Sequence, residues 1–355
     1  MENDIIKFLE KEKPLIDSII KKYIPENLDK KALEQIFGKA RYTYDIEALN
    51  KSLNEPIWDF LKRGGKRWRP ALFFLITEAL GGDLEKVKDF AMVIELAHNG
   101  SIMIDDIEDS GEMRRGKPCA HKMFGIDTAL NAGNMMYFLP LLVFMKNKNR
   151  FDKKTMLRAY DVFSQEMINI HAGQAMDIYW HKGKVDNIRE SQYLQMCAYK
   201  TGTLARMSAR LATVLSGGTK EQEEKMGKMA ETIGIAFQIQ DDILSASSKK
   251  FQRCKGYGDD IKEGKRTLMV INALEKADKK DRKRLLEIIN MHTNKKELVK
   301  EAIDILNKYD SINYAKEFAR KLVTESWKDV DPILKDSEAK SKLKRFVDFL
   351  VERDI

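Results

Sequence analysis

Hydrophobic and polar residues follow one another along this chain with the period of an α-helix, not with that of a β-strand. Apolar side chains recur every three or four positions, and no convincing run of alternating β-branched residues is present. Only 7 prolines and 20 glycines interrupt the pattern over 355 residues. The pattern therefore predicts an all-α fold.

Four long stretches are expected to be helical. The first breaks at Gly64–Gly65, resumes after Pro70 and stops at Gly81–Gly82, because glycine and proline end helices. The central stretches carry few charges over much of their surface, which is typical of buried helices. The four stretches are residues 58–82, 83–109, 192–218 and 225–247.

The chain is expected to form a single domain. Its length fits one large domain or two small ones, and no repeat, low-complexity tract or linker divides it. Within this domain we distinguish an N-terminal helical extension over residues 1–55, the motifs that carry chemistry over residues 56–270, and lysine-rich packing helices over residues 271–355.

The cysteines, the N-terminal residues and the apolar runs indicate the cellular compartment of the protein. Cys119, Cys197 and Cys254 are widely spaced and form no CxxC pair, which argues against a disulfide framework or a zinc site. The first residues include several acids and no apolar run, so no signal peptide is expected. The most apolar stretch, residues 135–145, is shorter than a bilayer span and contains Pro140. We expect a cytoplasmic protein without a transmembrane segment.

The net charge alone does not identify a partner. Lys and Arg exceed Asp and Glu by 63 − 55 = 8, an excess that could suit an acidic partner. Much of this excess is diffuse lysine in the C-terminal third. The organised basic residues lie beside acids that would repel nucleic-acid phosphates, so no nucleic-acid partner is expected.

The stretch "IDDIEDSGEMRRGK", residues 104–117, concentrates acids and bases. Asp105 and Asp109 are four positions apart and share one face of a helix, where two carboxylates repel each other unless a cation lies between them. Such oxygen ligands suit Mg²⁺, which completes its shell with substrate phosphates. Asp106 points partly away and could support this site. The simpler alternative is a solvated acidic surface.

A second acidic pair, Asp241 and Asp242, ends the stretch "FQIQDD". Gln238 and Gln240 lie inside an otherwise apolar helix and need hydrogen-bond partners, which indicates that the helix lines a polar cavity. A helix end with exposed acids is the alternative.

Basic residues accompany both acidic pairs. "GGKRWRP" places Lys66, Arg67 and Arg69 after a double glycine and before a helix, where the backbone can approach an anion. Arg114 and Arg115 follow the first acids, and the planar guanidinium suits diphosphate oxygens. Further candidates for diphosphate contacts are His98, two turns before Asp105 on the same face, and Lys200, Thr201, Lys255 and Lys265.

Five ordered motifs give the chain a resemblance to a known family. They are "GGKRWRP", "ELAHNGSIMIDDIED", "MRRGKP", "YKTG" and "FQIQDD…KGYGDDIKEGKRT", and they run from about residue 60 to residue 270. Together they resemble the trans-isoprenyl diphosphate synthases, which include farnesyl and geranylgeranyl diphosphate synthases. The resemblance implies an all-α isoprenoid-synthase-type bundle around a deep central cavity, usually as a homodimer.

The resemblance also implies an activity and residue roles. The enzyme would be a Mg²⁺-dependent prenyltransferase of isoprenoid biosynthesis, with three ions per site, that condenses isopentenyl diphosphate with allylic diphosphates. The isopentenyl diphosphate would bind to Lys66, Arg69, His98 and Arg115. The metal would bind to Asp105, Asp106, Asp109, Asp241 and Asp242. The allylic diphosphate would contact Arg114, Lys200, Thr201, Gln238, Lys255 and Lys265. The residues expected to act in the reaction itself are Asp105, Asp109, Arg114, Lys200, Asp241 and Lys265.

Product length is predicted from the positions before Asp105. Relatives that stop at C15 carry an aromatic residue four or five positions before the first aspartate, whereas this chain has Ser101 and Gly100 there. We therefore expect geranylgeranyl diphosphate or a longer product, with Met136 or Tyr137 of the following helix as the cavity floor. The alternatives are that the small residues only allow close helix packing, or that the product is farnesyl diphosphate.

One position departs from the family pattern. The second acidic motif of many relatives reads DDxxD, whereas Ser245 stands in its last place here. This departure keeps open a non-catalytic regulatory subunit of a prenyl synthase. A class I terpene cyclase is a further rival, against which "GGKRWRP", "FQIQDD" and His98 argue.

Overall fold

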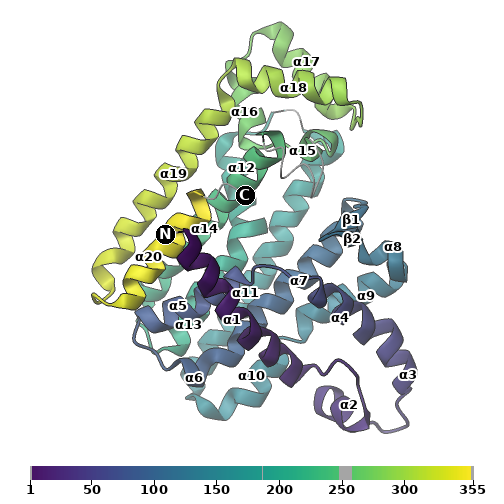
Figure 1. The fold of residues 1–355 in the computed structure, drawn as a ribbon, viewed down its shortest axis with the longest axis vertical. Coiled ribbons are helices and arrows are strands. Elements are labelled where there is room, and N and C mark those ends of the chain that lie inside the picture. The colour runs from purple at the N-terminus through teal and green to yellow at the C-terminus, as the bar shows by residue number, and fades with distance from the viewer. Residues whose placement is uncertain (1, 186, 248–257, 353–355) are drawn as a thin grey trace. The chain divides into compact units, whose positions relative to one another are not determined.

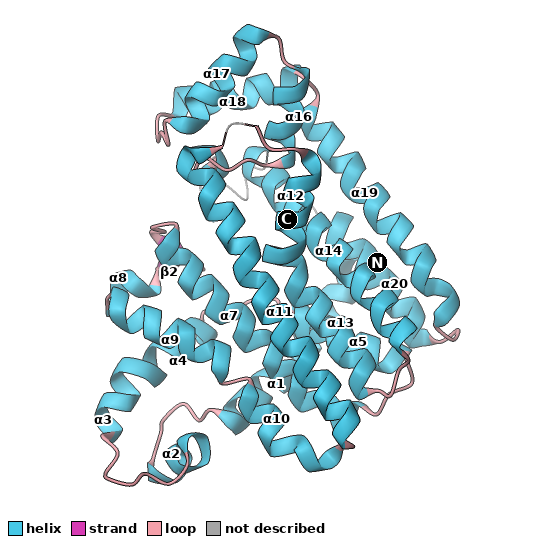
Figure 2. Cartoon of the chain, turned by 180° about the vertical axis from the view of Figure 1, so that it is seen from behind, coloured by secondary structure: helices cyan, strands magenta, loops and turns pink. Residues whose placement is uncertain are grey.

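The structure is a computed structural model that describes residues 2–185, 187–247 and 258–352. Helices make up nearly all of its regular structure (Figure 2). Within the described ranges, the strands are the two-residue β1 (Met113–Arg114) and β2 (Lys117–Pro118), which pair antiparallel with Arg114 opposite Lys117. The predicted all-α fold is confirmed.

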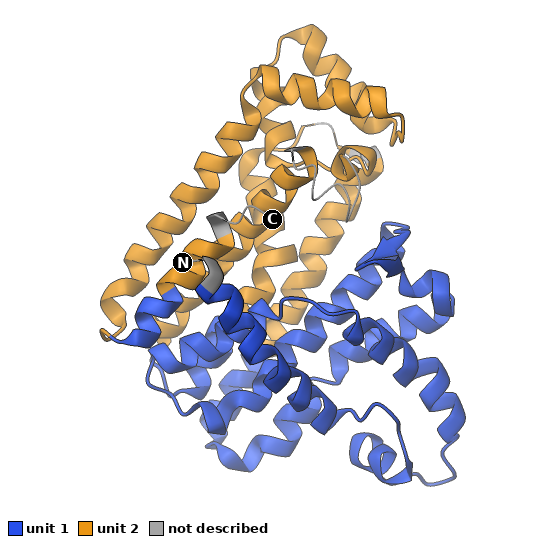
Figure 3. Cartoon of the chain, in the orientation of Figure 1, with its two compact units in different colours: residues 1–162, 208–219, 337–343 blue, residues 163–207, 220–336, 344–355 orange. Residues whose placement is uncertain are grey.

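The chain folds as two compact units, each built from separate stretches (Figure 3). Unit 1 contains residues 1–162, 208–219 and 337–343, and unit 2 contains residues 163–207, 220–336 and 344–355. The boundaries fall within or at the ends of α11 (Lys153–Tyr179), α13 (Thr203–Leu215) and α20 (Glu338–Glu352). The predicted N-terminal extension belongs to unit 1. The single domain stays a prediction.

Unit 1 is organised around α7 (Ala91–Glu108), most of which is buried. Helix α7 packs against α1, α5 and α9, and every residue of α5 except Glu78 is buried as well. Phe90, just before α7, meets Phe144 edge to face at 5.2 Å between ring centroids. The other helices of this unit are α1 (Glu2–Tyr23), α2 (Lys30–Phe37), α3 (Ile46–Leu49), α4 (Glu55–Lys62), α5 (Trp68–Ala79), α6 (Leu84–Val87), α8 (Ala120–Phe124), α9 (Ile126–Phe138) and α10 (Leu141–Asn147).

The end of the N-terminal helix α1 is fastened by a buried polar cluster. The Tyr23 hydroxyl and the Lys22 ammonium each donate a hydrogen bond of 2.7 Å to Asp89 Oδ2. Asn147 Nδ2 in turn donates to the Tyr23 hydroxyl at 2.7 Å. Burial and the Asp89 carboxylate raise the pKa of Tyr23, so this hydroxyl stays protonated and keeps donating. Helix α1 is therefore fixed to the segment that precedes α7 and to α10.

One helical stretch in the described part of the chain, Ile126–Arg150, is long and apolar enough to span a membrane by length and composition. It extends well beyond the run at 135–145 that the sequence prediction considered. Half of its most apolar window is buried in the fold, and Ala132, Gly133 and Met136 on it are buried in α9. A buried core helix meets the same criterion, so this stretch is weak evidence for a membrane span.

Unit 2 contains two long helices that pack against each other. Helix α14 (Lys220–Ser247) packs along α19 (Ser311–Val330) (Figure 1), and α16 (Leu268–Lys276) packs on α19 as well. The remaining helices are α12 (Glu190–Cys197), α15 (Asp259–Lys262), α17 (Lys279–Asn290) and α18 (Lys296–Lys308). The lysine-rich segment after residue 270 is mostly helical in its described part.

Two helices expected to be continuous are interrupted. Residues 83–109 form α6, a 3₁₀ turn η2 (Lys88–Phe90) and α7. Residues 192–218 form α12, a π-helical segment η5 (Ala198–Gly202) and α13. Helix α5 begins at Trp68, before Pro70 and not after it, because the first turn of a helix needs no N–H from proline.

Candidate active site

The first acidic motif lies at the C-terminal end of α7. Asp105 and Asp109 are partly exposed, and the backbone N–H of Asp109 donates to the Asp105 carbonyl at 2.9 Å, which closes the last turn. Asp106 between them is buried, with 2% of its surface exposed. Arg114 donates to Asp106 Oδ1 through Nε at 2.8 Å and Nη2 at 2.5 Å. The buried acid therefore orients a guanidinium, while its two neighbours remain accessible.

The glycine pair before α5 admits an arginine. Gly64 and Gly65 have φ values of 90° and 132°, which favour glycine. Arg115 Nη1 donates to the Gly64 carbonyl at 2.5 Å, and a Cβ on Gly65 would lie 3.3 Å from Arg115 Nη2. The loop of residues 64–67, which carries Lys66 and leads into α5 with Arg69, therefore contacts the Arg115 guanidinium.

Glu95 braces both the loop and Arg115. This buried carboxylate accepts from Arg67 Nη1 at 2.5 Å and from Asn99 Nδ2 at 2.6 Å. The Asn99 amide oxygen then accepts from Arg115 Nη1 at 3.2 Å. Arg67 itself is held in the left-handed region, with a φ of 51°. One acid of α7 therefore fixes two arginines, one directly and one through an amide.

His98 completes this group of residues. Arg69 Nη1 lies 3.3 Å from His98 Nε2. Burial and the charges of Arg69, Arg115, Arg67 and Arg114 keep the pKa of His98 well below its usual value. A guanidinium can only donate, so the neutral imidazole accepts at Nε2 and carries its proton on Nδ1. We name Lys66, Arg69, His98, Asp105, Asp109, Arg114 and Arg115, all in unit 1, the α7 site.

The predicted chain-length residues differ in what they contact. A Cβ on Gly100 would lie 2.9 Å from the Gly133 carbonyl and 3.0 Å from Met136 Cβ, so this glycine allows α7 and α9 to pack closely. Gly100 is therefore a packing position, which favours the close-packing alternative, and its assignment to a cavity wall stays a prediction. Met136 is fully buried in the same contact. Ser101 and Tyr137 are partly exposed, and burial together with Glu108 and Asp105 raises the pKa of Tyr137.

In unit 2, Lys200 and Thr201 lie on the π-helical segment η5, a feature that often marks functional positions. Two glycines clamp η5. A Cβ on Gly173 of α11 would lie 2.2 Å from the Lys200 nitrogen, and one on Gly234 of α14 would lie 2.5 Å from Gly202 Cα. The backbones therefore touch at both places, and they fix the direction of the side chains on η5.

The side chains of η5 are held by a polar network. Lys200 Nζ donates to Asp177 Oδ2 at 2.5 Å. The Thr201 hydroxyl donates to Gln238 Oε1 at 2.8 Å, and Gln238 Nε2 donates to Asp242 Oδ1 at 2.8 Å. These bonds satisfy the glutamine that the sequence placed inside an apolar helix.

The second acidic motif follows on α14. Asp241 is partly exposed, whereas Asp242 is buried and accepts a further hydrogen bond of 2.9 Å from the Tyr193 hydroxyl. Burial and the Asp260 carboxylate raise the pKa of Asp242 well above its usual value. Ser245, one turn later, is also buried. The motif therefore presents one accessible carboxylate.

Lys265 lies near the same motif, because its charge acts on Asp242. Its ammonium pairs with Glu263 at 2.5 Å and lies 4.0 Å from Asp260. The predicted Lys255 lies outside the described residues. We name Lys200, Thr201, Gln238, Asp241, Asp242 and Lys265, all in unit 2, the α14 site.

Sequence reasoning missed the residues that hold these side chains. Asp177, Glu95 and Tyr193 contact Lys200, Arg67 and Asp242, respectively. Asp177 and Glu95 carried a signal, since each is an acid inside an apolar helix and a buried acid needs a partner. Tyr193 carried none, because a tyrosine at a helical apolar position is ordinary core.

The donor set of the α7 site fits Mg²⁺. Within the described residues, no three His, Cys, Asp or Glu side chains converge to hold an ion by themselves. Asp105 and Asp109 offer two carboxylates one turn apart, and Mg²⁺ typically takes one or two carboxylates with substrate phosphates and water. The buried Asp106 and Asp242 hold Arg114 and Gln238 in place, and their role as metal ligands stays a prediction.

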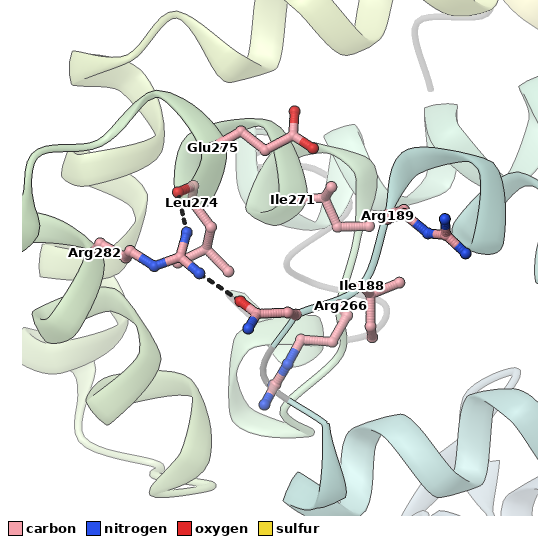
Figure 4. A pocket seen from close by; sticks show the side chains of 8 residues that line it. Ile188, Arg189, Arg266, Ile271, Leu274, Glu275 and Arg282 are labelled. Atoms are coloured by element: carbon pink, nitrogen blue, oxygen red, sulfur yellow. Dashed lines mark hydrogen bonds between the residues drawn. The ribbon is translucent and has the colours of Figure 1, made fainter.

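A separate pocket of about 140 Å³ lies in unit 2 (Figure 4). Arg189, Arg266 and Arg282 line it together with Glu275 and three apolar side chains. Two of these arginines are engaged by the fold. Arg282 donates to the Leu274 carbonyl and to Asn187 Oδ1, both at 2.5 Å, and Arg266 donates to the Gly264 carbonyl at 2.6 Å. These bonds show that Arg282 and Arg266 stabilise the surrounding backbone and side chains.

Comparison with known proteins relates the fold and these motifs to a family. Residues 50–306 match the family model described as polyprenyl synthetase. The chain is 35% identical over 295 residues to a geranylgeranyl pyrophosphate synthase from Geoglobus acetivorans, covering 83% of this chain and 89% of the relative. The crystal structure of a geranylgeranyl pyrophosphate synthetase from Pyrococcus horikoshii Ot3 superposes with a TM-score of 0.86 at 31% identity, covering 99% of each chain.

A more distant structure has the same fold. It is a geranylgeranyl pyrophosphate synthase from Corynebacterium glutamicum, crystallised with isoprenyl diphosphate and magnesium. Its TM-score is 0.80 at 20% identity, and the alignment covers 98% of this chain and 99% of the other.

Proposed function

This chain belongs to the polyprenyl synthetase family, and we propose that it condenses isopentenyl diphosphate with allylic diphosphates as far as the C20 product, geranylgeranyl diphosphate. It is a trans-prenyltransferase that forms this product or a similar prenyl diphosphate. One observation carries the proposal for the site. Arg69, Arg115 and His98 gather around α7, the helix that ends in two partly exposed carboxylates, and the charge of Asp105 acts on Arg114, as suits a reaction between two diphosphates.

The family depends on magnesium, and Asp105, Asp109 and Asp241 are the residues that would hold it in this chain. Bound there with the allylic diphosphate, Mg²⁺ supplies electrostatic stabilisation of the charge that develops on the leaving group. Asp106 and Asp242 support this arrangement from buried positions. Three ions per site is the number that the resemblance implies.

The cationic side chains divide between the two substrates. Arg114, Lys200 and Lys265, with Thr201 and Gln238, would bind the allylic diphosphate and stabilise it as its C–O bond ionises. Lys255 is assigned to the same group from its motif alone. The isopentenyl diphosphate would bind to Lys66, Arg69, His98 and Arg115. The forked guanidinium of the two arginines suits phosphate oxygens.

The carbon–carbon bond then forms when the double bond of isopentenyl diphosphate attacks the allylic cation. The intermediate loses a proton, and we assign this proton to the departing diphosphate, because the α7 and α14 sites offer no dedicated base. His98 is neutral and already accepts from Arg69 at Nε2. The apolar side chains around the growing chain would exclude water, which otherwise quenches the cation.

The experiment that tests this function is direct. Purified protein is incubated alone with isopentenyl diphosphate, each allylic primer and Mg²⁺, and the dephosphorylated products are separated by length. We expect geranylgeraniol from the protein without a partner chain. A protein that is inactive alone and active with a second chain would instead support the regulatory-subunit alternative.

The substrate assignment has its own test. Lys66→Ala or Arg69→Ala should raise KM mainly for isopentenyl diphosphate, and Lys200→Ala or Lys265→Ala mainly for the allylic substrate. Losing one charge-assisted contact should cost roughly 1.5–3 kcal/mol, about ten- to a hundredfold. If every variant affects both substrates equally, the assignment of the two groups fails.

For product length, Ser101 is the position to change. Its hydroxyl donates to the His98 carbonyl at 2.9 Å, and its side chain is partly exposed, so an aromatic ring there need not disturb the contact between α7 and α9. We expect Ser101→Phe to shorten the product to C15. Gly100→Phe serves as the contrast, because it would disrupt that contact and is expected to unfold the protein.

We also propose a homodimer in the cytoplasm. Large apolar side chains are exposed on and around α9 and α10, among them Ile126 at 60%, Phe138 at 65% and Met145 at 59%. A second copy would cover this surface without a membrane. Cys119 and Cys197 are buried free thiols, as suits a reducing compartment. Sedimentation equilibrium of the wild type and of Phe138→Glu tests the dimer.

A further inference from the structure

The N-terminal helix α1 reaches the loop of residues 64–67, which carries Lys66 and leads into α5 with Arg69. Asp17 of α1 accepts from Arg67 Nε at 3.2 Å. The remaining donors of Arg67 go to Glu95 and to the Leu61 carbonyl, at 2.5 Å and 2.9 Å. Helix α1 therefore supplies one of the partners of Arg67, which lies between Lys66 and Arg69, the two residues assigned to the diphosphate.

Arg67 needs these partners. Its backbone lies in the left-handed region, which is unfavourable for a residue with a side chain. Its guanidinium is buried, with 2% of the side chain exposed, and a buried charge requires acids around it. Asp17 and Glu95 supply them from two different helices, so the position of the loop depends on α1 as well as on α7.

Lys13 lies one turn before Asp17, on the same face of α1. A Cβ built on Gly64 would lie 4.0 Å from Lys13 Nζ, so the ammonium lies over the open side of the first loop glycine. The carbonyl of the same glycine accepts from Arg115. In the described part of the chain no ion pair is formed by Lys13, whereas Asp17 is paired with Arg67. The loop thus brings a lysine and an arginine to one glycine.

The location of Lys13 is fixed by the fold. The hydrogen bonds of Lys22 and Tyr23 to Asp89 anchor the C-terminal end of α1, and the Asp17–Arg67 pair anchors its middle. Both residues also lie outside residues 50–306, which match the family model. The family pattern alone therefore does not assign them a role.

We propose that α1 completes the isopentenyl diphosphate site, with Lys13 as a further residue that binds the diphosphate and Asp17 as a positioning residue that acts through Arg67. This inference rests on the proposed function of the α7 site. The extension before residue 55 is then part of the substrate site.

The test compares Lys13→Gln with Lys11→Gln. Lys11 is an exposed lysine of the same helix, two positions away and on another face. Lys13→Gln should raise KM for isopentenyl diphosphate about tenfold, as for one partly exposed charge-assisted contact, and leave KM for the allylic substrate within about twofold. Lys13→Arg should restore most of the affinity, and Lys11→Gln should behave as the wild type.

Asp17→Asn is the second variant, and it retains the shape of the side chain. It should raise KM for isopentenyl diphosphate about threefold while kcat stays near the wild-type value, because Glu95 still holds Arg67. Equal changes of KM for both substrates would reduce Asp17 to a structural role and overturn its part of the proposal.

Calorimetric binding of inorganic diphosphate without Mg²⁺ separates this inference from the proposed function, since it needs no turnover. Weaker binding by Lys13→Gln than by Lys11→Gln supports the inference even if no prenyl product forms. If Lys66→Ala weakens binding and Lys13→Gln does not, the inference fails and the proposed function stands. If the wild type forms no prenyl product, the proposed function fails.

Discussion

The two acidic motifs follow one plan and differ in what surrounds the second acid. In each motif the first acid is partly exposed and the second is buried, Asp106 at 2% and Asp242 at 5% exposure. Asp106 is held by the cationic Arg114, whereas Asp242 is held by the neutral Tyr193 and Gln238. Burial and the Asp260 carboxylate raise the pKa of Asp242, and the hydrogen bonds from Gln238 and Tyr193 oppose this rise.

The difference extends to the last place of each motif. Asp109 is partly exposed at the end of α7, whereas Ser245 is buried within α14. The α7 motif therefore presents two accessible carboxylates and the α14 motif one. Burial removes the second acid from both motifs alike, so the difference in accessible carboxylates comes from the serine in the last place of the α14 motif.

The largest expected effect tests this inequality. Asp105→Ala or Asp109→Ala should lower kcat/KM by about a thousandfold or more, because a ligand at the developing charge is lost, and Asp241→Ala should lower it by about a hundredfold. Steady-state kinetics measures both. The exposed Asp127→Ala is the control, and circular dichroism confirms the fold. Near-normal activity of Asp105→Ala with an intact fold would refute the metal-site assignment.

The next effect concerns stability. Asp106→Asn removes the charge that pairs with Arg114 and should lower the free energy of unfolding by about 2–3 kcal/mol. Asp242→Asn replaces a carboxyl among neutral donors and should change it by less than about 1 kcal/mol. Urea unfolding compares the two variants. Equal losses in the free energy of unfolding would mean that the side chains around the second acid do not affect its contribution to stability.

The cationic group of the α7 site predicts a pH dependence. The pKa of His98 is lowered in the folded state by burial and by Arg69, so below the ordinary pKa of histidine the unfolded chain binds a proton that the folded chain does not. Stability should therefore fall as the pH drops from 7 to 5.5, and less so in His98→Gln. The exposed His171→Gln is the control. Parallel curves for the wild type and His98→Gln would contradict the prediction.

The smallest effect is expected at Ser245. Ser245→Asp restores the family's third acid, but the site is buried and cannot easily present a charge. Activity should persist, and the Mg²⁺ concentration at half-maximal rate should change by less than about twofold, within the range of one weak ion pair. A wild type that is inactive alone and becomes active through this change would favour the regulatory-subunit alternative.

The sequence was sufficient for the helices because their apolar residues repeat with the helical period. It was not sufficient for η5, since the residues of a π-helical turn continue the same pattern, and the close backbone approaches at Gly173 and Gly234 come from other helices. The same limit explains Gly100. A small residue before Asp105 looks like open space in a sequence, and only the position of Gly133 shows that the space is filled by another helix.

The ligand-type residues were accessible to sequence reasoning because diphosphate chemistry needs Asp, Lys and Arg in recognisable spacing. The residues that hold them were less accessible. Glu95 and Asn99 lie one turn apart on α7, yet their partners Arg67 and Arg115 are 28 and 16 positions away. Such pairings follow from the way the helices pack, and the local sequence does not predict them.

The clamp around η5 bears on how the protein tolerates variation. At Gly173 and Gly234 the backbones of α11 and α14 touch η5, and even an added methyl group would have to push Lys200 or Gly202 aside. An alanine at either glycine would therefore displace η5, which carries Lys200 and Thr201, the residues that we assign to the allylic diphosphate. A library designed to alter product size should keep these two codons fixed. We expect substitutions at these two glycines to lower the rate of turnover in protein that is still expressed and folded.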